Sequence, residues 1–306
     1  MILKEFALDP KLIKDWDSCR LFLMPFDIYQ GRQLSEFPDL RLWKDLIIKS
    51  LDKDRVGPKQ RKKIVEYIKS KKNSHTFIKR SSLYKKQQEW LDNCKRENEV
   101  KPFNAVVYKG KESEIDNFLP DKDFTPEHPL MSASVGRPIC RKVEDLTTHL
   151  IPLIDQSKEI IFVDPYFRAN KSNYLKPIEK FMKIISRNPK NIKRKKIAFH
   201  HNNGGMDIKS RFSPNDIMQK WKEELTPIVP QDIKLELFIW ERSEMHNRYV
   251  FTEIMGVQYG HGLGEGTDSL NNEDEITPLD HETYRERREK FNDPLKTPYL
   301  VINDGI

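Results

Sequence analysis

The spacing of apolar residues changes near residue 138, beyond which short apolar runs alternate with amphipathic segments. Runs rich in β-branched and aromatic residues predict strands at residues 159–166, 196–201, 234–240 and 248–252. Helical patterns lie between these runs, at residues 143–156, 175–187 and 213–227. Ser213 suits the N-cap of the third helix, Pro214 suits its first turn, and Pro152 bends or shortens the first helix. This succession predicts an α/β sheet covered by helices.

The first 135 residues show a different pattern. Apolar runs predict strands at residues 19–24 and 103–108, and amphipathic patterns predict helices at residues 40–50, 59–70 and 82–93. We therefore expect a mixed or mainly helical N-terminal domain over residues 1–135. A stretch rich in proline and polar residues at 118–126 is typical of a linker, and residues 136–306 form the second domain in this interpretation.

Composition narrows the class of partner. The 306 residues are 37% hydrophobic and 33% charged, with a formal net charge of +7, which favours nucleic acid as the partner. The chain has no apolar run long enough for a membrane helix and no signal-peptide pattern at its start. Its three cysteines, Cys19, Cys94 and Cys140, have no disulfide or zinc spacing. We expect a cytoplasmic protein that does not act at a membrane.

The positive charge is concentrated in residues 51–100, which hold 15 Lys and Arg against 7 Asp and Glu, a difference of +8. Aromatic residues lie among these cations, a combination that suits phosphate contacts and stacking on unpaired bases. The alternative is a helix surface that lysines keep soluble. Under the first interpretation, the nucleic-acid-binding candidates are Lys62, Lys63, Lys71, Lys72, Lys79 and Arg80.

The candidate chemistry begins with His246, Arg248 and Glu253, in and after an apolar run. Side chains alternate along a strand, so His246 and Arg248 are expected to share one face. An imidazole beside a fixed positive charge can attack or bind a phosphate. The alternative is an ordinary histidine on a strand beside a surface arginine.

Two further segments accompany this motif. The turn from Gly260 to Gly266 is rich in glycine, so its backbone can approach a ligand closely, or it is a flexible loop that closes the sheet. His200 and His201 follow another predicted strand, at a position where ligands of α/β sheets commonly bind. No carboxylate or further histidine stands near them in a metal-ligand spacing, so we expect no metal site.

The motif resembles the HKD signature of the phospholipase D superfamily, His-x-Lys-x4-Asp-x6-Gly-Ser-x-Asn. Here the pattern is His246-Asn247-Arg248, four residues, Glu253, six residues, and Gly260-His261-Gly262-Leu263. Arginine stands for lysine, glutamate for aspartate, and His261 and Leu263 for serine and asparagine. The resemblance extends over residues 140–265 and includes Asp164-Pro165-Tyr166-Phe167 after the first strand of the domain. It implies a phospholipase-D-like sheet covered by helices.

The resemblance also implies a mechanism and an assembly. One histidine attacks phosphorus and a second protonates the leaving oxygen. Because the chain has one HKD match, the two histidines would be His246 of each subunit in a homodimer. Arg248 would bind the non-bridging oxygens, Glu253 would orient the histidine, and no metal or cofactor would be needed. Substrate contacts are expected from the neighbouring positions Asn247, Gly260, His261 and His201.

These features lead us to expect a metal-independent endonuclease that cleaves DNA phosphodiesters, with RNA as an alternative substrate. The N-terminal domain would deliver substrate or bind a partner protein. The arginine form of the motif resembles phospholipase-D-like proteins of prokaryotic defence and mobile-element loci, which implies an effector in antiviral defence. Two alternatives are a catalytically silent subunit that binds nucleic acid or acts as a scaffold, and a true phospholipase.

Overall fold

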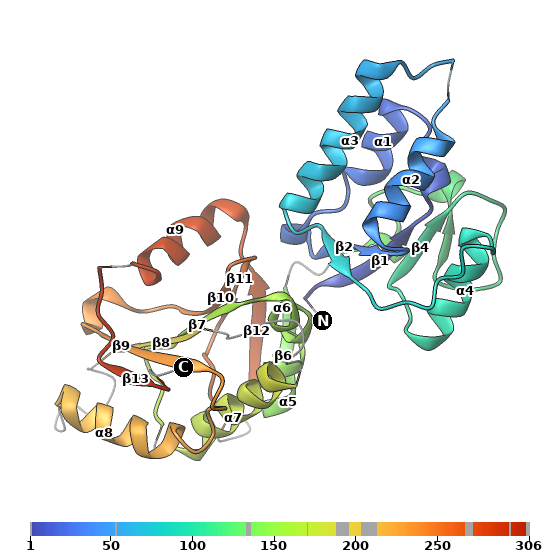
Figure 1. Cartoon of the computed structure of the whole chain (residues 1–306). Helices are drawn as coiled ribbons and strands as arrows, with labels where there is room; N and C mark the ends of the chain where they lie inside the picture. Colours follow the sequence, from blue (N-terminus) through green and yellow to red (C-terminus); the bar gives the residue numbers. More distant parts are fainter. Residues whose placement is uncertain are drawn as a thin grey trace. The chain divides into compact units, whose positions relative to one another are not determined.

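The computed structural model describes residues 2–52, 54–132, 136–169, 171–187, 196–202, 213–266, 272–293 and 295–303. The chain divides into two compact units (Figure 1). One unit is Leu3–Ser134, and the other is Val135–Ile306 together with Met1–Ile2. The sequence places the domain boundary between residues 135 and 136.

The N-terminal unit contains a five-stranded sheet in the order β3-β2-β1-β4-β5, in which every pair of neighbours is parallel. The strands are β1 (Lys4–Leu8), β2 (Arg32–Glu36), β3 (Phe77–Lys79), β4 (Ala105–Tyr108) and β5 (Phe118–Pro120). The α-helices are α1 (Trp16–Leu23), α2 (Leu40–Ser50), α3 (Pro58–Asn73) and α4 (Trp90–Val100). Short 3-10 helices are η1 (Pro10–Leu12), η2 (Ile28–Gln30), η3 (Asp121–Asp123) and η4 (Pro129–Met131).

Of the two interpretations that the sequence leaves open, a mixed or a mainly helical N-terminal domain, the structure shows the mixed one, because this unit is α/β. Its strands are only three to five residues long, and β4 and β5 are buried along their whole length. A strand buried on both faces lacks the alternation of apolar and polar residues that identifies a half-exposed strand. For this reason the composition of residues 118–120 predicts part of a linker, whereas these residues form the edge strand β5.

Residues 19–24, expected as a strand, belong to helix α1 and its C-cap. The helix begins at a capping box in which the Asp15 carboxylate accepts the Ser18 backbone N–H and the Ser18 hydroxyl accepts the Asp15 backbone N–H. Cys19, Phe22 and Leu23 are then buried at helical spacing. Of the predicted helices, the second became α3 with slightly wider bounds, whereas the third begins only at Trp90.

The second unit is built on an eight-stranded mixed sheet in the order β13-β9-β8-β7-β10-β11-β12-β6. Only the neighbours β7, β8 and β9 are parallel, and the other pairs are antiparallel. The strands are β6 (Arg137–Cys140), β7 (Glu159–Val163), β8 (Lys196–Asn202), β9 (Lys234–Trp240), β10 (Arg248–Thr252), β11 (Gly256–Tyr259), β12 (Glu273–Pro278) and β13 (Leu300–Ile302). The strands predicted at residues 159–166, 196–201, 234–240 and 248–252 correspond to β7 to β10.

The helices of this unit are α5 (Val143–Thr148), α6 (Ile151–Gln156), α7 (Ser172–Ser186), α8 (Pro214–Leu225), α9 (His281–Phe291) and the short η5 (Arg242–Glu244). The predicted interruption at Pro152 is confirmed, because this proline lies in the first turn of a separate helix, α6. The predicted start of α8 is also confirmed, since Ser213 and Asp216 form a capping box there. Together the two units make a mixed α/β protein.

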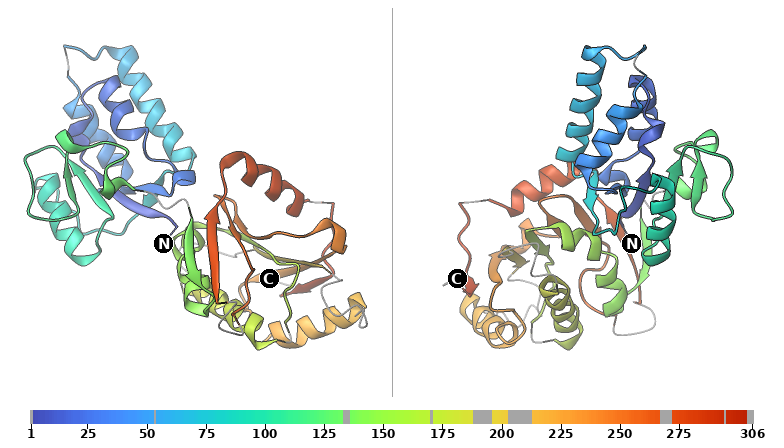
Figure 2. Two further views of the ribbon diagram at one scale, coloured as in Figure 1. Left: turned by 180° about the vertical axis from the view of Figure 1, so that it is seen from behind. Right: turned by 45° about the vertical axis from the view of Figure 1, so that its right-hand side comes forward.

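The two faces of the eight-stranded sheet are covered by different helices (Figure 2). On β8, Phe199 and His201 contact Trp221 of α8. The intervening His200 contacts Phe291 of α9. Because side chains alternate along a strand, α8 and α9 cover opposite faces. None of the described helices is long and apolar enough to cross a membrane.

Candidate active site

Several of the predicted site residues, His246, Arg248, Gly260 and His261, lie at one end of the eight-stranded sheet, where its strands stop or begin. Parallel strands β7 and β8 end there, whereas β10 is antiparallel to β7 and begins there. Strand β11 is antiparallel to β10 and stops at the same end of the sheet. The ends of four strands thus bring together the segments at residues 164–168, 200–202, 246–248 and 260–263. In open α/β sheets, ligands commonly bind outside the carboxyl ends of parallel strands.

Arg248 is half-buried at the start of β10, between an aromatic ring and a carboxylate. Its guanidinium carbon lies 4.7 Å from the centre of the Tyr166 ring. Its charge also acts on Asp164, the residue that follows β7. The register pairs Tyr249 with Val163, so Arg248 and Asp164 are adjacent across the two strands. The Tyr166 ring and the Asp164 carboxylate thus both attract this cation at the end of the sheet where β7 stops.

Asp164 is a fully buried carboxylate that holds two loops together. Its two oxygens accept the backbone N–H groups of Tyr166 at 2.9 Å and of Leu263 at 2.8 Å. Burial raises the pKa of Asp164, and the two amide hydrogen bonds and the charges of Arg248 and Arg168 counteract that rise. Asp164 therefore ties the turn after β11 to the end of β7.

Two glycines in that turn are required by close contacts. Gly262 has a φ of +99°, and a Cβ at this position would lie 2.6 Å from an Asp164 carboxylate oxygen. A Cβ on Gly260 would lie 2.5 Å from Oδ1 of Asp274 on β12. The glycines thus let the backbone wrap around two buried carboxylates. The sequence allows two interpretations, a turn that binds a ligand and a flexible loop that closes the sheet. Among the described residues, Asp164 and Asp274 hold this turn by accepting the backbone N–H groups of Leu263 and His261.

His261 stands between these two glycines with its side chain 59% exposed. Its backbone N–H donates to Asp274 Oδ1 at 2.9 Å, and its Nδ1 lies 3.4 Å from the same oxygen. The Asp274 side chain is only 1% exposed. An accessible imidazole backed by a buried carboxylate is the arrangement that orients histidines for proton transfer.

His246 and Asn247 lie just before β10 and are exposed. Strand β10 begins at Arg248, so His246 lies two residues before the strand and not within it. The side-chain amide of Asn247 donates to the Tyr249 hydroxyl at 2.8 Å, so this exposed side chain also contacts the protein.

The expected role of Glu253 is contradicted by its position. It follows the far end of β10, so the whole strand of five residues, roughly 16 Å long, lies between Glu253 and the end at which His246 is found. Its carboxylate accepts the backbone N–H groups of Lys158 at 2.6 Å and of Glu159 at 3.1 Å. Glu253 therefore fixes the start of β7 and does not orient His246.

His201 is also not placed to contact a substrate directly. It is 3% exposed and packs against Trp221. Burial, together with the nearby charge of Arg168, lowers the pKa of His201 to about 3. The imidazole is thus neutral at physiological pH and belongs to the layer beneath the site.

We expect this buried imidazole to make the second unit less stable in acid. The folded pKa of about 3 lies below the usual value of 6.5, so the unfolded chain binds the proton more readily between these values. Stability is therefore lost as the pH falls below the unfolded pKa, by about 2 kcal/mol at pH 5. Thermal unfolding at pH 7.5 and pH 5 should show a smaller acid-induced loss for His201→Gln than for wild type. The exposed His281→Gln is the matched control, and equal losses in all three proteins would contradict the prediction.

The sequence did not single out several residues that shape the site. Asp164 and Tyr166 belong to the run that resembles the phospholipase D superfamily after the first strand of the domain, but the resemblance implies no role for either residue. Asp274 belongs to no motif of the sequence, and no local pattern pairs it with His261. Arg168, 93% buried, contributes its charge beneath the site and donates to the Phe167 carbonyl at 2.8 Å. The contacts that define these roles come from residues distant in the sequence.

The six basic candidates of the N-terminal unit differ in availability. Lys62, Lys63, Lys72 and Lys79 are exposed, with the Lys63 ammonium 4.0 Å from the Trp16 ring centre. Lys71 donates to the Phe26 carbonyl at 2.7 Å. The expectation for Arg80 is wrong, because its side chain is 1% exposed and pairs with Glu5 at 3.0 Å and Glu97 at 2.8 Å.

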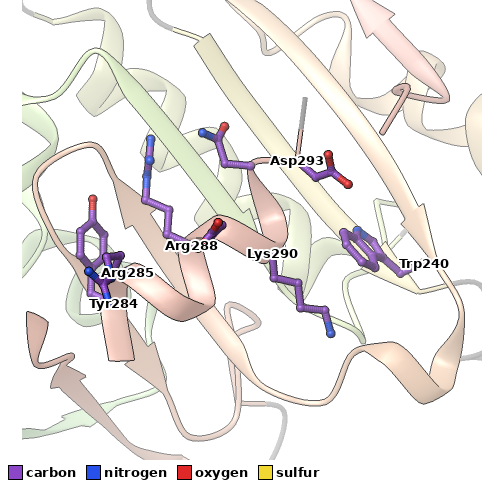
Figure 3. A pocket seen from close by; sticks show the side chains of 8 residues that line it. Trp240, Tyr284, Arg285, Arg288, Lys290 and Asp293 are labelled. Atoms are coloured by element: carbon purple, nitrogen blue, oxygen red, sulfur yellow. The ribbon is translucent and has the colours of Figure 1, made fainter. Parts of the chain in front are cut away.

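A separate pocket lies along α9, on the sheet face opposite His201 (Figure 3). Its lining contains none of the predicted site residues and consists of Trp240, Tyr284, Arg285, Arg288, Glu289, Lys290, Asn292 and Asp293. Arg288 pairs with Glu159, and the Lys290 ammonium donates to the Glu244 carbonyl. Two of the cations around this pocket are thus already engaged by protein groups.

No protein-family model matches the chain, and no curated protein matches it. Among solved structures, the chain is similar to TrmBL2, an archaeal chromatin protein described as showing a novel mode of DNA binding. The sequence identity is 13% and the TM-score 0.28, over 78% of this chain and 70% of that one. At this TM-score the likeness establishes neither a shared fold nor a shared function.

Proposed function

We propose that the second unit is a phospholipase-D-like phosphodiesterase that cleaves DNA through a histidine nucleophile, without a metal ion. One observation supports the proposal: His246 and Arg248, at the start of β10, and His261, after the end of β11, lie at the same end of the sheet. The carboxyl ends of β7 and β8 lie at this end too. Two buried carboxylates, Asp164 and Asp274, hold the turn that carries His261.

The proposed reaction divides phosphodiester cleavage into two displacements. In the first, an imidazole nitrogen of His246 bonds to phosphorus and the bond to the leaving oxygen breaks. In the second, a water oxygen bonds to phosphorus and the phosphorus–nitrogen bond breaks. Arg248 binds the non-bridging oxygens, for which its planar guanidinium offers two parallel donors. A second group must give a proton to the leaving oxygen and later take one from water; the resemblance assigns this role to His246 of a partner copy.

Substrate delivery is proposed for the N-terminal unit. Helix α3 fully buries only Ile64 and Ile68, and its exposed residues include Lys62, Lys63 and Lys72. Cations that project from one helix can contact successive phosphates of a DNA backbone. This contribution predicts that DNA affinity falls steeply with salt concentration.

The test of the proposed function is nicking of supercoiled and single-stranded DNA in excess EDTA. We expect cleavage to persist in EDTA. We also expect a covalent protein–DNA adduct that survives alkaline quenching and is lost in acid, as a phosphohistidine would be. Cleavage abolished by EDTA, with no adduct, would sink the histidine mechanism. DNA binding without any cleavage would instead favour a silent binding subunit.

A further inference from the structure

His246 lies two residues before β10 and His261 lies two residues after β11, just beyond the ends of these two adjacent strands. The β10–β11 ladder pairs Arg248 with Tyr259, and two more residues in the same register set His246 opposite His261. Side chains directly opposite each other on antiparallel strands point to the same face, with Cβ atoms about 5 Å apart. Both histidines are exposed beyond the ends of their strands. The register therefore brings both histidines to the same end of the sheet, on neighbouring segments of the chain.

The same reasoning links His261 to Asp274, and here the described contacts agree with it. The β11–β12 ladder pairs Tyr259 with Ile276, and its continuation sets His261 opposite Asp274. The Gly260 backbone N–H donates to the Glu275 carbonyl at 3.3 Å, which continues the pairing of the two strands. The His261 amide then reaches Asp274 Oδ1 at 2.9 Å. The register thus sets His246, His261 and Asp274 in successive positions at one end of β10, β11 and β12.

Asp274 has the surroundings of a positioning carboxylate. Its Oδ1 accepts the backbone N–H groups of His261 and Glu275, at 2.9 and 2.8 Å, and lies 3.4 Å from His261 Nδ1. Its Oδ2 is buried and has no hydrogen-bond partner among the described residues. A buried carboxylate beside Nδ1 favours the imidazole form with a proton on that nitrogen. The other nitrogen of His261, Nε2, is then left to exchange protons with a substrate.

We propose that His261, positioned by Asp274, is the proton-transfer partner of His246 within one chain. This inference rests on the proposed function and replaces the partner copy's histidine with a residue of the same site. As His246 bonds to phosphorus, Nε2–H of protonated His261 gives its proton to the leaving oxygen. In the second displacement, neutral His261 takes a proton from the attacking water. The pair then returns to its starting protonation state, with both protons accounted for.

The consequence is a site that one chain completes. In the arrangement implied by the resemblance, two copies of His246 must meet on a two-fold axis. Here the serine position of the signature is occupied by His261, the residue that supplies the second imidazole. A monomer is then sufficient for cleavage, and dimerisation adds no group to the reaction.

The test compares two substrates that differ in the need for a proton donor. Supercoiled DNA loses an alkoxide, which must be protonated, whereas bis-p-nitrophenyl phosphate loses p-nitrophenolate, a stable anion. We expect His261→Ala to lower kcat on DNA by about 10² to 10⁴-fold and kcat on the nitrophenyl ester by less than about tenfold. His246→Ala should abolish both reactions. Asp274→Asn should follow the same pattern as His261→Ala but more weakly.

His261 is exposed, so its alanine variant tests the proposal even if Asp274→Asn fails to fold. Retained activity on both substrates, or equal losses on both, overturns the inference while leaving His246 as nucleophile. If His246→Ala also retains activity, the proposed function itself fails. Size-exclusion fractions of the wild type give a second readout. Nicking by the monomer supports a site within one chain, and nicking by dimers alone contradicts it.

Discussion

Replacing His246 with alanine is expected to reduce DNA cleavage in EDTA by at least about 10³-fold, to the limit of detection. The nucleophile of a covalent mechanism has no substitute, because removing one member of a catalytic group forfeits most of the rate that the group provides. His246 is exposed before the first residue of β10, so the substitution removes no buried contact. We therefore expect the variant to fold normally and to bind DNA with wild-type affinity. Plasmid nicking and DNA binding, measured on the same preparations, check both expectations.

The matched control is His281→Ala. His281 is also an exposed histidine of the second unit, at the first position of α9. His281 follows Leu279, whose backbone N–H donates to the Gly256 carbonyl at the start of β11. His281 therefore lies at the end of the sheet opposite His246. We expect this variant to cleave like the wild type. Equal activity of His246→Ala and wild type would exclude His246 as the nucleophile.

Replacing Arg80 with alanine is expected to destabilise the N-terminal unit by about 3–5 kcal/mol. The guanidinium pairs with Glu5 of β1 and Glu97 of α4, and it lies 3.9 Å from the Phe103 ring centre. Removing a buried cation leaves its partner carboxylates without compensation, which costs far more than losing a surface ion pair. Urea unfolding followed by tryptophan fluorescence measures the loss, because three of the five tryptophans lie in this unit, Trp16, Trp43 and Trp90.

The neighbouring Lys79 provides the control, since it is exposed at the end of β3. We expect Lys79→Ala to change the stability by less than about 0.5 kcal/mol. The pH dependence gives a second check. Burial raises the pKa of Glu5, but Arg80 and Lys101 bring it below its usual value, so this carboxylate stabilises the fold above the unfolded pKa. The difference in unfolding free energy between Arg80→Ala and wild type should shrink as the pH falls from above the unfolded pKa of Glu5 to below its folded pKa. Similar losses of stability in Arg80→Ala and Lys79→Ala would contradict a buried ion pair at Arg80.

Local patterns were sufficient for much of the second unit. Strand β10 starts and ends where its apolar run predicts, and Ser213 begins α8 as its side chain and the following proline indicate. They were insufficient where an element is short or buried on both faces, as in β3 and β5. The run at residues 19–24 was assigned as a strand because its helical spacing becomes clear only from Trp16 onward.

For the candidate site, sequence spacing identified residues without deciding what each one contacts. His246 and Arg248 are two residues apart in the motif, and both lie at the end of the sheet where β7 and β8 stop. Glu253 is part of the same motif, yet the five residues of β10 place it at the other end of the sheet. The number of residues between two positions sets how far apart they lie along a strand. The direction of that strand in the sheet decides which end of the sheet each position reaches.

The sequence by itself determined the elements whose causes are local: capped helices, apolar strands, glycines in the turn and an imidazole near a cation. Tertiary structure alone decided which charged groups are buried and with whom they pair. It enclosed Arg80 between two glutamates, placed His201 beneath the site and set Asp274 behind His261. The physical reason is that burial and pairing depend on neighbours supplied by other strands and helices. For His261 and Asp274, that neighbour is fixed by the register of β11 against β12, which no local pattern encodes.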